Sequence, residues 1–293
     1  MMAGGENGRP RDPLPAARGA AWFMLSLELL RRQASRLLFI AILMQLVLGL
    51  VQVPLLGILV VLSVPGLTAG ILEAFHVTAR GGAPSLRLLF LPLATGDRRG
   101  RLFALGALVF AVGILCVSML LGGALAGLDE ATLLRLQQGD MSALDAAGPA
   151  FISRLVAAFA ISVAISGTLT FFSVPLVWFR DLRVWPALSA GLGGLLRHWK
   201  ALLVLGLVLA AASLPFALLI GLLLQVASAG GVIAYIATGL VMVLLLLYQL
   251  VLFGTQYCSF REIFGFAESV PPATALQSGD DENDGDDDGQ LVA

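Results

Sequence analysis

The architecture of the chain follows from one segment, residues 37–77, which reads LLFIAILMQLVLGLVQVPLLGILVVLSVPGLTAGILEAFHV. As one helix, this segment would be about 60 Å long, twice the ~30 Å hydrocarbon core of a bilayer. Gln52-Val53-Pro54 interrupts it, and proline lacks the amide hydrogen that a helix interior needs but suits a helix start. The segment therefore predicts two membrane-spanning helices, residues 37–53 and 55–78.

The remainder of the chain has the same apolar character. Of its 293 residues 58% are hydrophobic and 13% are charged, with a mean hydropathy of +0.93, whereas about a quarter of the residues of a typical soluble domain are charged. Further apolar runs predict spans over residues 102–126, 151–179, 201–227 and 231–258. We therefore predict an all-α fold: a polytopic transmembrane bundle of six helices (residues 37–265) with interfacial amphipathic helices.

The basic residues are distributed unequally between the two sides of this predicted bundle. Sixteen of the 18 lysines and arginines fall before the first span, between spans two and three, between spans four and five, and after the last span. The other side carries Arg135 and Arg154. Because connections rich in Lys and Arg stay in the cytoplasm, we expect both termini to be cytoplasmic.

The two ends of the chain differ from its apolar body. Residues 1–18 are rich in Gly, Pro and Arg, and we expect a disordered cytoplasmic head without a cleaved signal peptide. Residues 266–293 predict a disordered acidic cytoplasmic tail, in which positions 280–288 hold seven of the 19 acids and could contact a basic protein partner. The acidic run in this tail resembles the first positions of an EF-hand calcium-binding loop. Leu291 occupies the position at which that loop needs a glutamate, so no calcium site is expected.

Residues 19–36 show helical periodicity. The apolar positions are Phe23, Leu27, Leu30 and Ala34. The polar positions are Glu28, Arg31, Arg32 and Ser35. We expect an amphipathic helix that lies in the membrane interface, with Trp22 as its aromatic anchor.

Polar residues within the first two spans form two groups. Gln45 and Gln52 are one heptad apart, which favours interhelical hydrogen bonding and leaves a polar path as the alternative. Glu73 and His76 share a helix face at i, i+3, and Arg80 follows four residues later. A di-iron bundle would need two such Glu-x-x-His motifs and two more carboxylates, so we expect a polar cluster at a helix end and no metal site.

Two further groups fall where spans meet the cytoplasmic boundary. Arg197, His198 and Lys200 precede the fifth span, where basic and aromatic residues anchor a helix to headgroups and could contact anionic phospholipids. Tyr257 and Arg261 end the sixth span. We expect Tyr257 in the headgroup layer and Arg261 at the water boundary.

Small residues recur every four positions along the fourth span, at Ala158, Ser162, Ser166 and Thr170. Such a stripe lets a neighbouring helix approach closely, which is the interpretation that we favour. A hydroxyl-lined substrate path is the alternative.

Two connections on the cytoplasmic side resemble each other. After Pro65 and again after Pro175, a moderately apolar segment is followed by a basic cluster and then by a Leu- and Gly-rich span. Duplication of a span–surface helix–span unit would explain this similarity.

Motifs for catalysis or cofactor binding are absent from the sequence, which has no nucleophile elbow, phosphate loop, HExxH motif or nucleotide fingerprint. Cys116 and Cys258 lie in apolar segments and form no CxxC pair. A membrane-bound enzyme would need several polar residues to converge at the cytoplasmic face, such as Glu73, His76, Tyr257 and Glu262. We expect no enzyme activity, no catalytic residue, no cofactor and no nucleic-acid partner.

Five stretches together carry a family resemblance. They are the amphipathic segment at Trp22, VPGLTAGIL (64–72), the 84–101 connection, VPLVWFRDLRVWPALSAGLGGLLRHW (174–199) and QYCSFREIFG (256–265). Over residues 19–265 the chain resembles a family of six-helix bacterial inner-membrane proteins named after one locus of unknown function. It is more distantly similar to the membrane domains of glycerophosphodiester phosphodiesterases. The family pattern usually has Asp where Glu262 stands and Asn near His198, and it supplies no catalytic residues. The resemblance implies a six-helix, multi-pass protein of the bacterial inner membrane.

Two functions are consistent with these observations. The first is an integral inner-membrane protein without enzyme activity, which acts as an accessory, scaffold or regulatory component in contact with the lipid bilayer. The second is a transporter or permease for a small or lipid-like solute. The second predicts a water-accessible cavity near mid-membrane that is lined by Gln45, Gln52, Ser162 or Ser166, and a tightly packed bundle without such a cavity would exclude it.

Overall fold

The computed structural model describes residues 10, 12–53, 56–125, 128–138, 140, 142–228 and 230–265. The acidic tail with its calcium-like motif lies outside these residues. The described part of the chain is helical and contains no strand. Six of its helices are long and apolar enough to cross a membrane. The predicted all-α, six-helix polytopic bundle is confirmed at the level of fold class.

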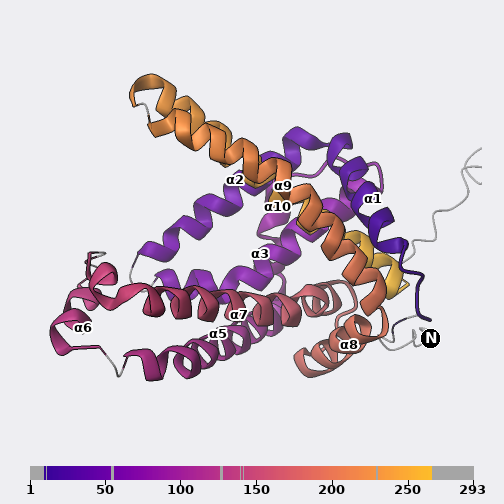
Figure 1. Cartoon of the computed structure of the whole chain (residues 1–293). Coiled ribbons are helices and arrows are strands. Elements are labelled where there is room, and N and C mark those ends of the chain that lie inside the picture. Colours follow the sequence, from indigo (N-terminus) through magenta and orange to yellow (C-terminus); the bar gives the residue numbers. More distant parts are fainter. Residues whose placement is uncertain are drawn as a thin grey trace, which may run out of the picture.

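The elements form three successive units, each with a short helical segment followed by two long helices (Figure 1). The first unit comprises α1 (Arg18–Arg32), α2 (Ala34–Gly49), the 3-10 turn η1 (Leu50–Gln52) and α3 (Leu56–Ala79). The second comprises the 3-10 turn η2 (Leu86–Leu89), α4 (Leu91–Ala94), α5 (Gly96–Leu125), the small helix α6 (Glu130–Gln137) and α7 (Ala143–Phe179). The third comprises α8 (Val184–Arg197), α9 (Trp199–Ser228) and α10 (Gly231–Ile263). A surface segment before a pair of spans thus occurs three times.

Local backbone conformations mark the ends of the long helices. Gln33 has φ −139° and ψ 41°, which separates α1 from α2. Gly230 and Gly231 have φ of 81° and 69° and form the turn between α9 and α10, where the sequence predicts a break. Gly148, with φ 83°, interrupts α7, so the membrane span of that helix begins there.

The short helix in the connection between the third and fourth spans is α6, and Asp129 caps it. One carboxylate oxygen of Asp129 accepts a hydrogen bond from the backbone amide of Thr132 at 3.1 Å, and the other accepts from the Thr132 hydroxyl at 2.6 Å.

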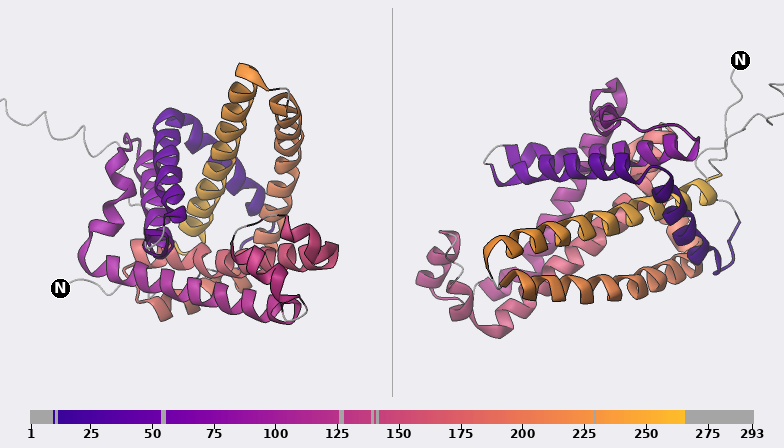
Figure 2. Two further views of the ribbon diagram at one scale, coloured as in Figure 1. Left: turned by 90° about the vertical axis from the view of Figure 1, so that its left-hand side faces the viewer. Right: turned by 90° about the horizontal axis from the view of Figure 1, so that it is seen from above.

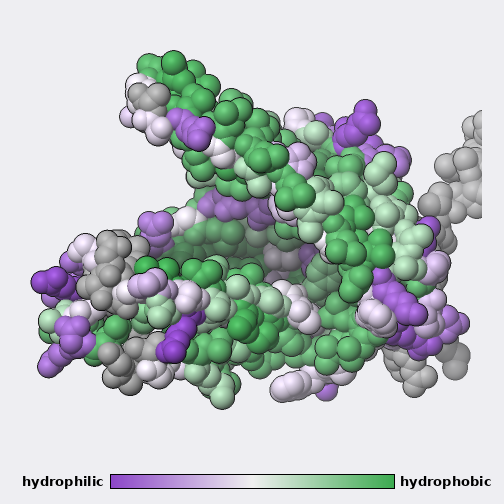
Figure 3. Space-filling model, in the orientation of Figure 1, coloured by the Kyte–Doolittle hydropathy of each residue, from purple (hydrophilic) through white to green (hydrophobic). Residues whose placement is uncertain are grey.

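The helix ends meet at one end of the molecule, and the long helices diverge from it (Figures 1 and 2). We call this the basic end, because it holds Arg18, Arg98, Arg101, Arg180 and Arg197. The α9–α10 hairpin extends away from the pair formed by α5 and α7, and a hollow separates these two arms (Figure 3). Twelve of the 24 residues of α3 are buried, compared with two of the 30 residues of α9, so α3 is central and α9 peripheral.

The buried core is concentrated at the basic end. Its largest fully buried side chains include Trp22, Phe75, Phe172, Tyr257 and Phe260. Towards the other end the helices expose large apolar side chains, as is expected where the solvent is lipid rather than water. The molecule is therefore held together at one end, while its arms expose the apolar surfaces of the candidate spans.

Glycine residues allow two of the closest helix contacts. A Cβ atom on Gly19 of α1 would lie 2.1 Å from the carbonyl oxygen of Ala201 on α9. A Cβ atom on Gly106 of α5 would lie 2.2 Å from the carbonyl oxygen of Leu62 on α3. Any side chain at these positions would push the helices apart, because backbone atoms cannot move aside as a side chain can.

The amphipathic helix predicted over residues 19–36 forms as α1, but its buried face differs from the expected one. The buried positions are Gly19, Trp22, Ser26, Leu29 and Leu30, and the helix packs against α9 and α10. Trp22 is 0% exposed. The expectation that Trp22 anchors this helix in the headgroup layer is therefore wrong, since its indole is enclosed by the protein.

Candidate functional site

The carboxylate of Glu262, in the last turn of α10, ties α10 to α1. One oxygen accepts a hydrogen bond from Nε of Arg18 at 2.6 Å, and the other accepts from Nη2 of Arg18 at 2.6 Å and from Nε1 of Trp22 at 2.8 Å. The side chain of Glu262 is 22% exposed. The hydrogen bond to this carboxylate raises the pKa of Arg18, so the guanidinium keeps its charge. A bidentate pair with a third donor fixes the two helices in one relative position.

A second carboxylate has a similar partner. Glu73 on α3 accepts a hydrogen bond from Nε1 of Trp178 on α7 at 2.7 Å, and Trp178 is buried. The guanidinium of Arg98 lies over the indole ring of Trp178, 5.4 Å from its centroid. Each of these glutamates therefore accepts a hydrogen bond from a buried tryptophan on another helix.

His76 and Tyr257 form the third contact at the basic end. Nδ1 of His76 lies 3.0 Å from the hydroxyl oxygen of Tyr257. The ring of Phe179 lies 5.4 Å from that of His76, and it stacks on the ring of Phe260 at 5.7 Å. Tyr257 is 1% exposed. The expectation that Tyr257 lies in the headgroup layer is wrong, because its hydroxyl is enclosed between α3 and α10.

The four polar residues that an enzyme would need are only partly brought together. His76 contacts Tyr257, and Glu73 lies one helical turn before His76. Glu262 follows Tyr257 by five residues on α10, and its carboxylate contacts α1 instead. Within the part of the chain that the structure describes, no three His, Cys, Asp or Glu residues are grouped so that they could hold a metal ion.

Asp181 joins the end of α7 to the start of α5. Its φ of 55° is left-handed, a conformation that Asp tolerates better than most residues. Oδ1 accepts hydrogen bonds from Nε of Arg98 and Nη1 of Arg101, both at 3.0 Å, and the Asp181 carbonyl accepts from Nη1 of Arg101 at 2.6 Å. From the sequence, Arg98 and Arg101 are predicted only to lie at the membrane boundary, and their contact with Asp181 is not predicted. The sequence feature that could have indicated this contact is an acidic residue directly after a span.

His198 lies at the junction of α8 and α9 and is 1% exposed. Nδ1 lies 3.1 Å from the carbonyl oxygen of Gly194, and Nε2 lies 3.1 Å from the carbonyl oxygen of Asp12. Arg197 donates a hydrogen bond to Oδ1 of Asp12 at 2.9 Å. The expectation that His198 contacts lipid headgroups is wrong, because both of its ring nitrogens face backbone oxygens of the protein.

The other expected boundary residues lie at the surface. Arg80 is exposed just after α3, and Arg261 is half-buried in the last turn of α10. The ammonium group of Lys200 lies 5.8 Å from the ring centroid of Trp199, which is 56% exposed. Contacts of these residues with lipid headgroups stay predictions.

The two glutamines of the first span have different surroundings. Nε2 of Gln45 on α2 donates a hydrogen bond to Oε1 of Gln249 on α10 at 2.6 Å. Gln52 is exposed in η1, beyond the end of α2, so the heptad spacing does not place both glutamines on one face of one helix. An interhelical hydrogen bond is therefore present at Gln45, and its partner comes from the last span.

Gln256 is a structural residue that sequence reasoning misses. Pro175 inside α7 has no N–H to donate to the carbonyl of Phe171, one turn earlier. Nε2 of Gln256 on α10 donates to that carbonyl at 2.7 Å, and Gln256 is 6% exposed. The sequence feature that could have indicated this role is Pro175, because a carbonyl that loses its helical hydrogen bond within a membrane needs a donor from elsewhere.

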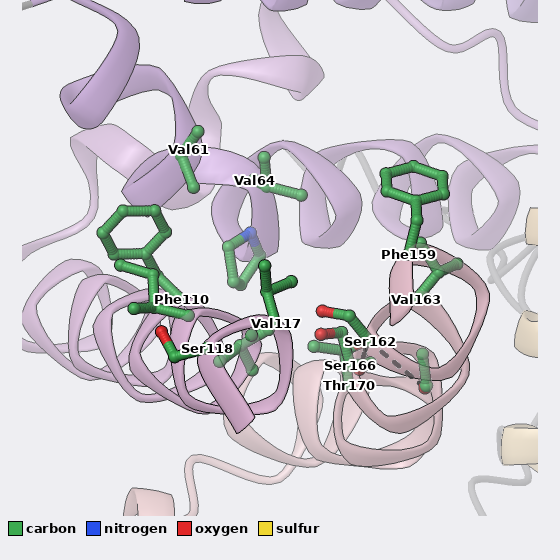
Figure 4. A pocket seen from close by; sticks show the side chains of 16 residues that line it. Val61, Val64, Phe110, Val117, Ser118, Phe159, Ser162, Val163, Ser166 and Thr170 are labelled. Atoms are coloured by element: carbon green, nitrogen blue, oxygen red, sulfur yellow. Dashed lines mark hydrogen bonds between the residues drawn. The ribbon is translucent and has the colours of Figure 1, made fainter. Parts of the chain in front are cut away.

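A groove of about 610 Å³ lies between α3, α5 and α7 (Figure 4). None of the 16 residues that line it is charged, and its hydroxyl groups belong to Ser118, Ser162, Ser166 and Thr170. Ser162 and Ser166 point from α7 into the space between the helices (Figure 4). The groove is bordered by Ser162 and Ser166 but not by Gln45 or Gln52, so it includes two of the four residues at which a transporter predicts a water-accessible cavity. Its apolar lining does not test that prediction.

The fold and these contacts define an all-helical polytopic membrane protein with six candidate spans that are tied together at one end. No family model, no curated protein and no solved structure matches the chain.

Proposed function

We propose that the chain is a multi-pass protein of the bacterial inner membrane, without enzyme activity, that acts as an accessory, scaffold or regulatory component. The observation that supports this role is that two carboxylates at the basic end accept hydrogen bonds from neighbouring helices. Glu262 accepts three hydrogen bonds from α1, and Glu73 accepts one from Trp178. A general acid or base needs its reacting oxygen within hydrogen-bond reach of a substrate. Here the carboxylates serve to hold helices together.

The distribution of charge supports the proposed orientation. Cations cluster at the basic end, while Arg135 on α6 and Arg154 on α7 belong to the opposite end. Because positively charged connections remain in the cytoplasm, the basic end is the cytoplasmic side and both termini are cytoplasmic. The bacterial inner membrane follows from the family resemblance, which no comparison tests. Contact with anionic phospholipids and with a protein partner through the acidic tail belongs to the same proposal.

The proposed role is tested by complementation of a deletion strain. Glu73→Gln and Tyr257→Phe are each expressed, and the amount of folded protein is measured beside growth and the lipid composition of the envelope. We expect restoration in proportion to the folded amount, because both groups act through the structure. Tyr235→Phe is the matched control, since Tyr235 is 82% exposed at the far end of α10. A variant that reaches the normal folded amount but restores nothing would show a chemical role and overturn the proposal.

The groove favours a second candidate, a carrier for a lipid-like solute. Its apolar lining with few hydroxyl groups is typical of sites that enclose amphiphiles. Proteoliposomes that contain a fluorescent phospholipid, with dithionite added outside, separate the two functions. An accessory protein leaves the rate of lipid crossing at that of protein-free vesicles, and a faster rate would favour the carrier.

A further inference from the structure

The groove has the dimensions of a chain-like ligand. On α5 its lining extends from Gly106 to Ser118, and on α7 it extends from Phe159 to Thr170. At 1.5 Å of rise per residue these stretches are about 18 Å and 16 Å long, which exceeds half of the ~30 Å hydrocarbon thickness. Its volume of about 610 Å³ lies within the range of small-molecule sites. An extended lipid chain fits this shape.

Three hydroxyl groups in the groove are available to a ligand. Thr170 donates its hydroxyl to the backbone carbonyl of Ser166 at 2.8 Å, as hydroxyls in membrane helices commonly do. The side-chain hydroxyls of Ser118, Ser162 and Ser166 make no hydrogen bond to any residue that the structure describes. A hydroxyl in an apolar medium gains free energy from any partner that it finds there. A ligand with an oxygen group would supply that partner.

The α3 wall of the groove contains a proline. Pro65 lines the groove and cannot donate a hydrogen bond to the carbonyl of Val61, which also lines it. At Pro175 the corresponding carbonyl accepts from Gln256, whereas no described side chain donates to the Val61 carbonyl. The hydroxyls on α5 and α7 match a ligand hydroxyl, because each of these groups both donates and accepts.

The absence of charge from the lining excludes an ionic headgroup at the hydroxyls. Along α7, Arg154 precedes Ser162 by eight residues, or about 12 Å of helix. Towards the basic end, Arg180 follows Ser166 by 14 residues, or about 21 Å. A phosphate or carboxylate at the serines would have no compensating charge in a medium where such charge is expensive. The polar group of the ligand is therefore neutral.

We propose that the groove between α3, α5 and α7 binds an uncharged lipid alcohol, with its hydroxyl group at Ser162 and Ser166 and its chain along the apolar walls. This inference goes beyond the proposed accessory role and rests only on the membrane placement of the six helices. It holds equally for a static site and for a carrier.

The test uses the purified full-length protein in phosphatidylcholine nanodiscs with a diazirine-bearing hexadecanol as the probe. After photolysis, labelled peptides are mapped by mass spectrometry, and oleyl alcohol, hexadecane or phosphatidylglycerol is added as competitor. Gly167→Leu fills the groove, because a Cβ at Gly167 meets no atom within 4 Å. Gly239→Leu on α10 is the matched control, since its Cβ also meets nothing and Gly239 does not line the groove.

We expect label on the α5 and α7 peptides, competed by oleyl alcohol and reduced at least about tenfold in Gly167→Leu, the loss that corresponds to 1.4 kcal/mol of binding free energy. Gly239→Leu should be labelled like the parent protein. Replacing Ser162 and Ser166 together by Ala should weaken competition by oleyl alcohol about five- to tenfold, as one or two lost hydrogen bonds would, and leave competition by hexadecane unchanged.

Three outcomes would overturn the proposal: label spread evenly over all helices, equal label in the two leucine variants, or competition by phosphatidylglycerol as effective as that by oleyl alcohol. Thermal unfolding shows whether Gly167→Leu is folded. If Gly167→Leu is not folded, the variant with Ser162 and Ser166 both replaced by Ala tests the proposal. Unchanged competition by oleyl alcohol in that variant would contradict the proposed binding site. Complementation by Glu73→Gln and Tyr257→Phe does not involve the groove, so failure of the accessory role remains distinguishable.

Discussion

Glu262 on α10 and Arg18 on α1 are 244 residues apart in the chain and form a bidentate ion pair, with both N–O distances at 2.6 Å. The first helix of the structure is thereby fastened to the end of the last one. Trp22 adds its indole hydrogen bond to the same carboxylate. The arms diverge from the basic end, where the buried core lies. The Arg18–Glu262 ion pair therefore joins α1 to α10 at the part of the molecule that holds the helices together.

Replacing Glu262 with Gln should lower the free energy of unfolding by about 1–2 kcal/mol, since a charge-assisted bidentate pair is lost but Arg18 remains partly solvated. The measurement is thermal or denaturant unfolding of the purified protein in detergent. Glu28→Gln is the control, because Glu28 pairs with Arg32 on the exposed surface of α1. The control should cost less than about 0.5 kcal/mol. Equal effects of the two substitutions would contradict the assigned role.

Trp178→Phe should destabilise the protein by about 1–3 kcal/mol, because it removes the indole donor and leaves the Glu73 carboxylate with a lost partner. Trp185→Phe is the matched control, since Trp185 is 73% exposed on α8. A double variant with Glu73→Leu isolates the pair, because leucine has no acceptor for the indole N–H. If Trp178→Phe costs as much in the Glu73→Leu background as in the parent protein, the hydrogen bond does not contribute.

The six-helix architecture could be predicted because it depends on local properties of the sequence. Apolar runs of bilayer length identify the spans, and Gly230-Gly231 marks a turn that only glycine adopts easily. These signals act over about 20 residues. They require no knowledge of which helix lies next to which.

The surroundings of Trp22, Tyr257 and His198 could not be predicted in the same way. Each side chain combines an apolar body with one polar group, which suits both a headgroup layer and a protein interior with one partner. The partners lie far along the chain, 240 residues away for Trp22 and 181 residues away for Tyr257. Periodicity alone cannot show that such residues meet.

The groove was accessible to sequence reasoning only in part. The stripe of Ser162, Ser166 and Thr170 predicts a small-residue face, for which close packing is the favoured interpretation and a lined cavity the alternative. Both occur, because Ser162 Oγ would lie 3.3 Å from a Cβ on Gly113 of α5 and also borders the groove. The separation of neighbouring helices depends on side chains from three elements, which one span does not reveal.

Gly19→Ala should destabilise the contact between α1 and α9 by about 1–3 kcal/mol, as overpacking of a close contact does. The added methyl group would meet the carbonyl oxygen of Ala201 at 2.1 Å. Gly206→Ala on α9 is the control, because a Cβ there meets no atom within 4 Å and should be neutral or slightly stabilising. Unfolding midpoints of the two variants decide. A Gly19→Ala protein as stable as Gly206→Ala would show that α1 does not pack directly on α9.

Gln256→Leu should cost about 1–2 kcal/mol, because the carbonyl of Phe171 loses its donor in an apolar interior. The effect depends on Pro175, which cannot supply the ordinary helical hydrogen bond. In a Pro175→Ala background, the backbone amide of the introduced alanine can donate a hydrogen bond to the Phe171 carbonyl, so Gln256→Leu should have a much smaller effect in that background. The free energy of unfolding is measured for the parent protein, the two single variants and the double variant, which together form a double-mutant cycle. Equal costs in both backgrounds would contradict the proposed replacement of the donor.

The orientation is tested by cysteine labelling, in a background with Cys116 and Cys258 replaced by Ala. Arg135→Cys lies on α6, and Arg87→Cys lies on η2 near the basic end. A membrane-impermeant maleimide added to intact spheroplasts should label position 135, and it should label position 87 only after the membrane is disrupted. This follows because cations that remain in the cytoplasm define the inner side. Labelling of position 87 in intact spheroplasts would reverse the orientation and place both termini outside.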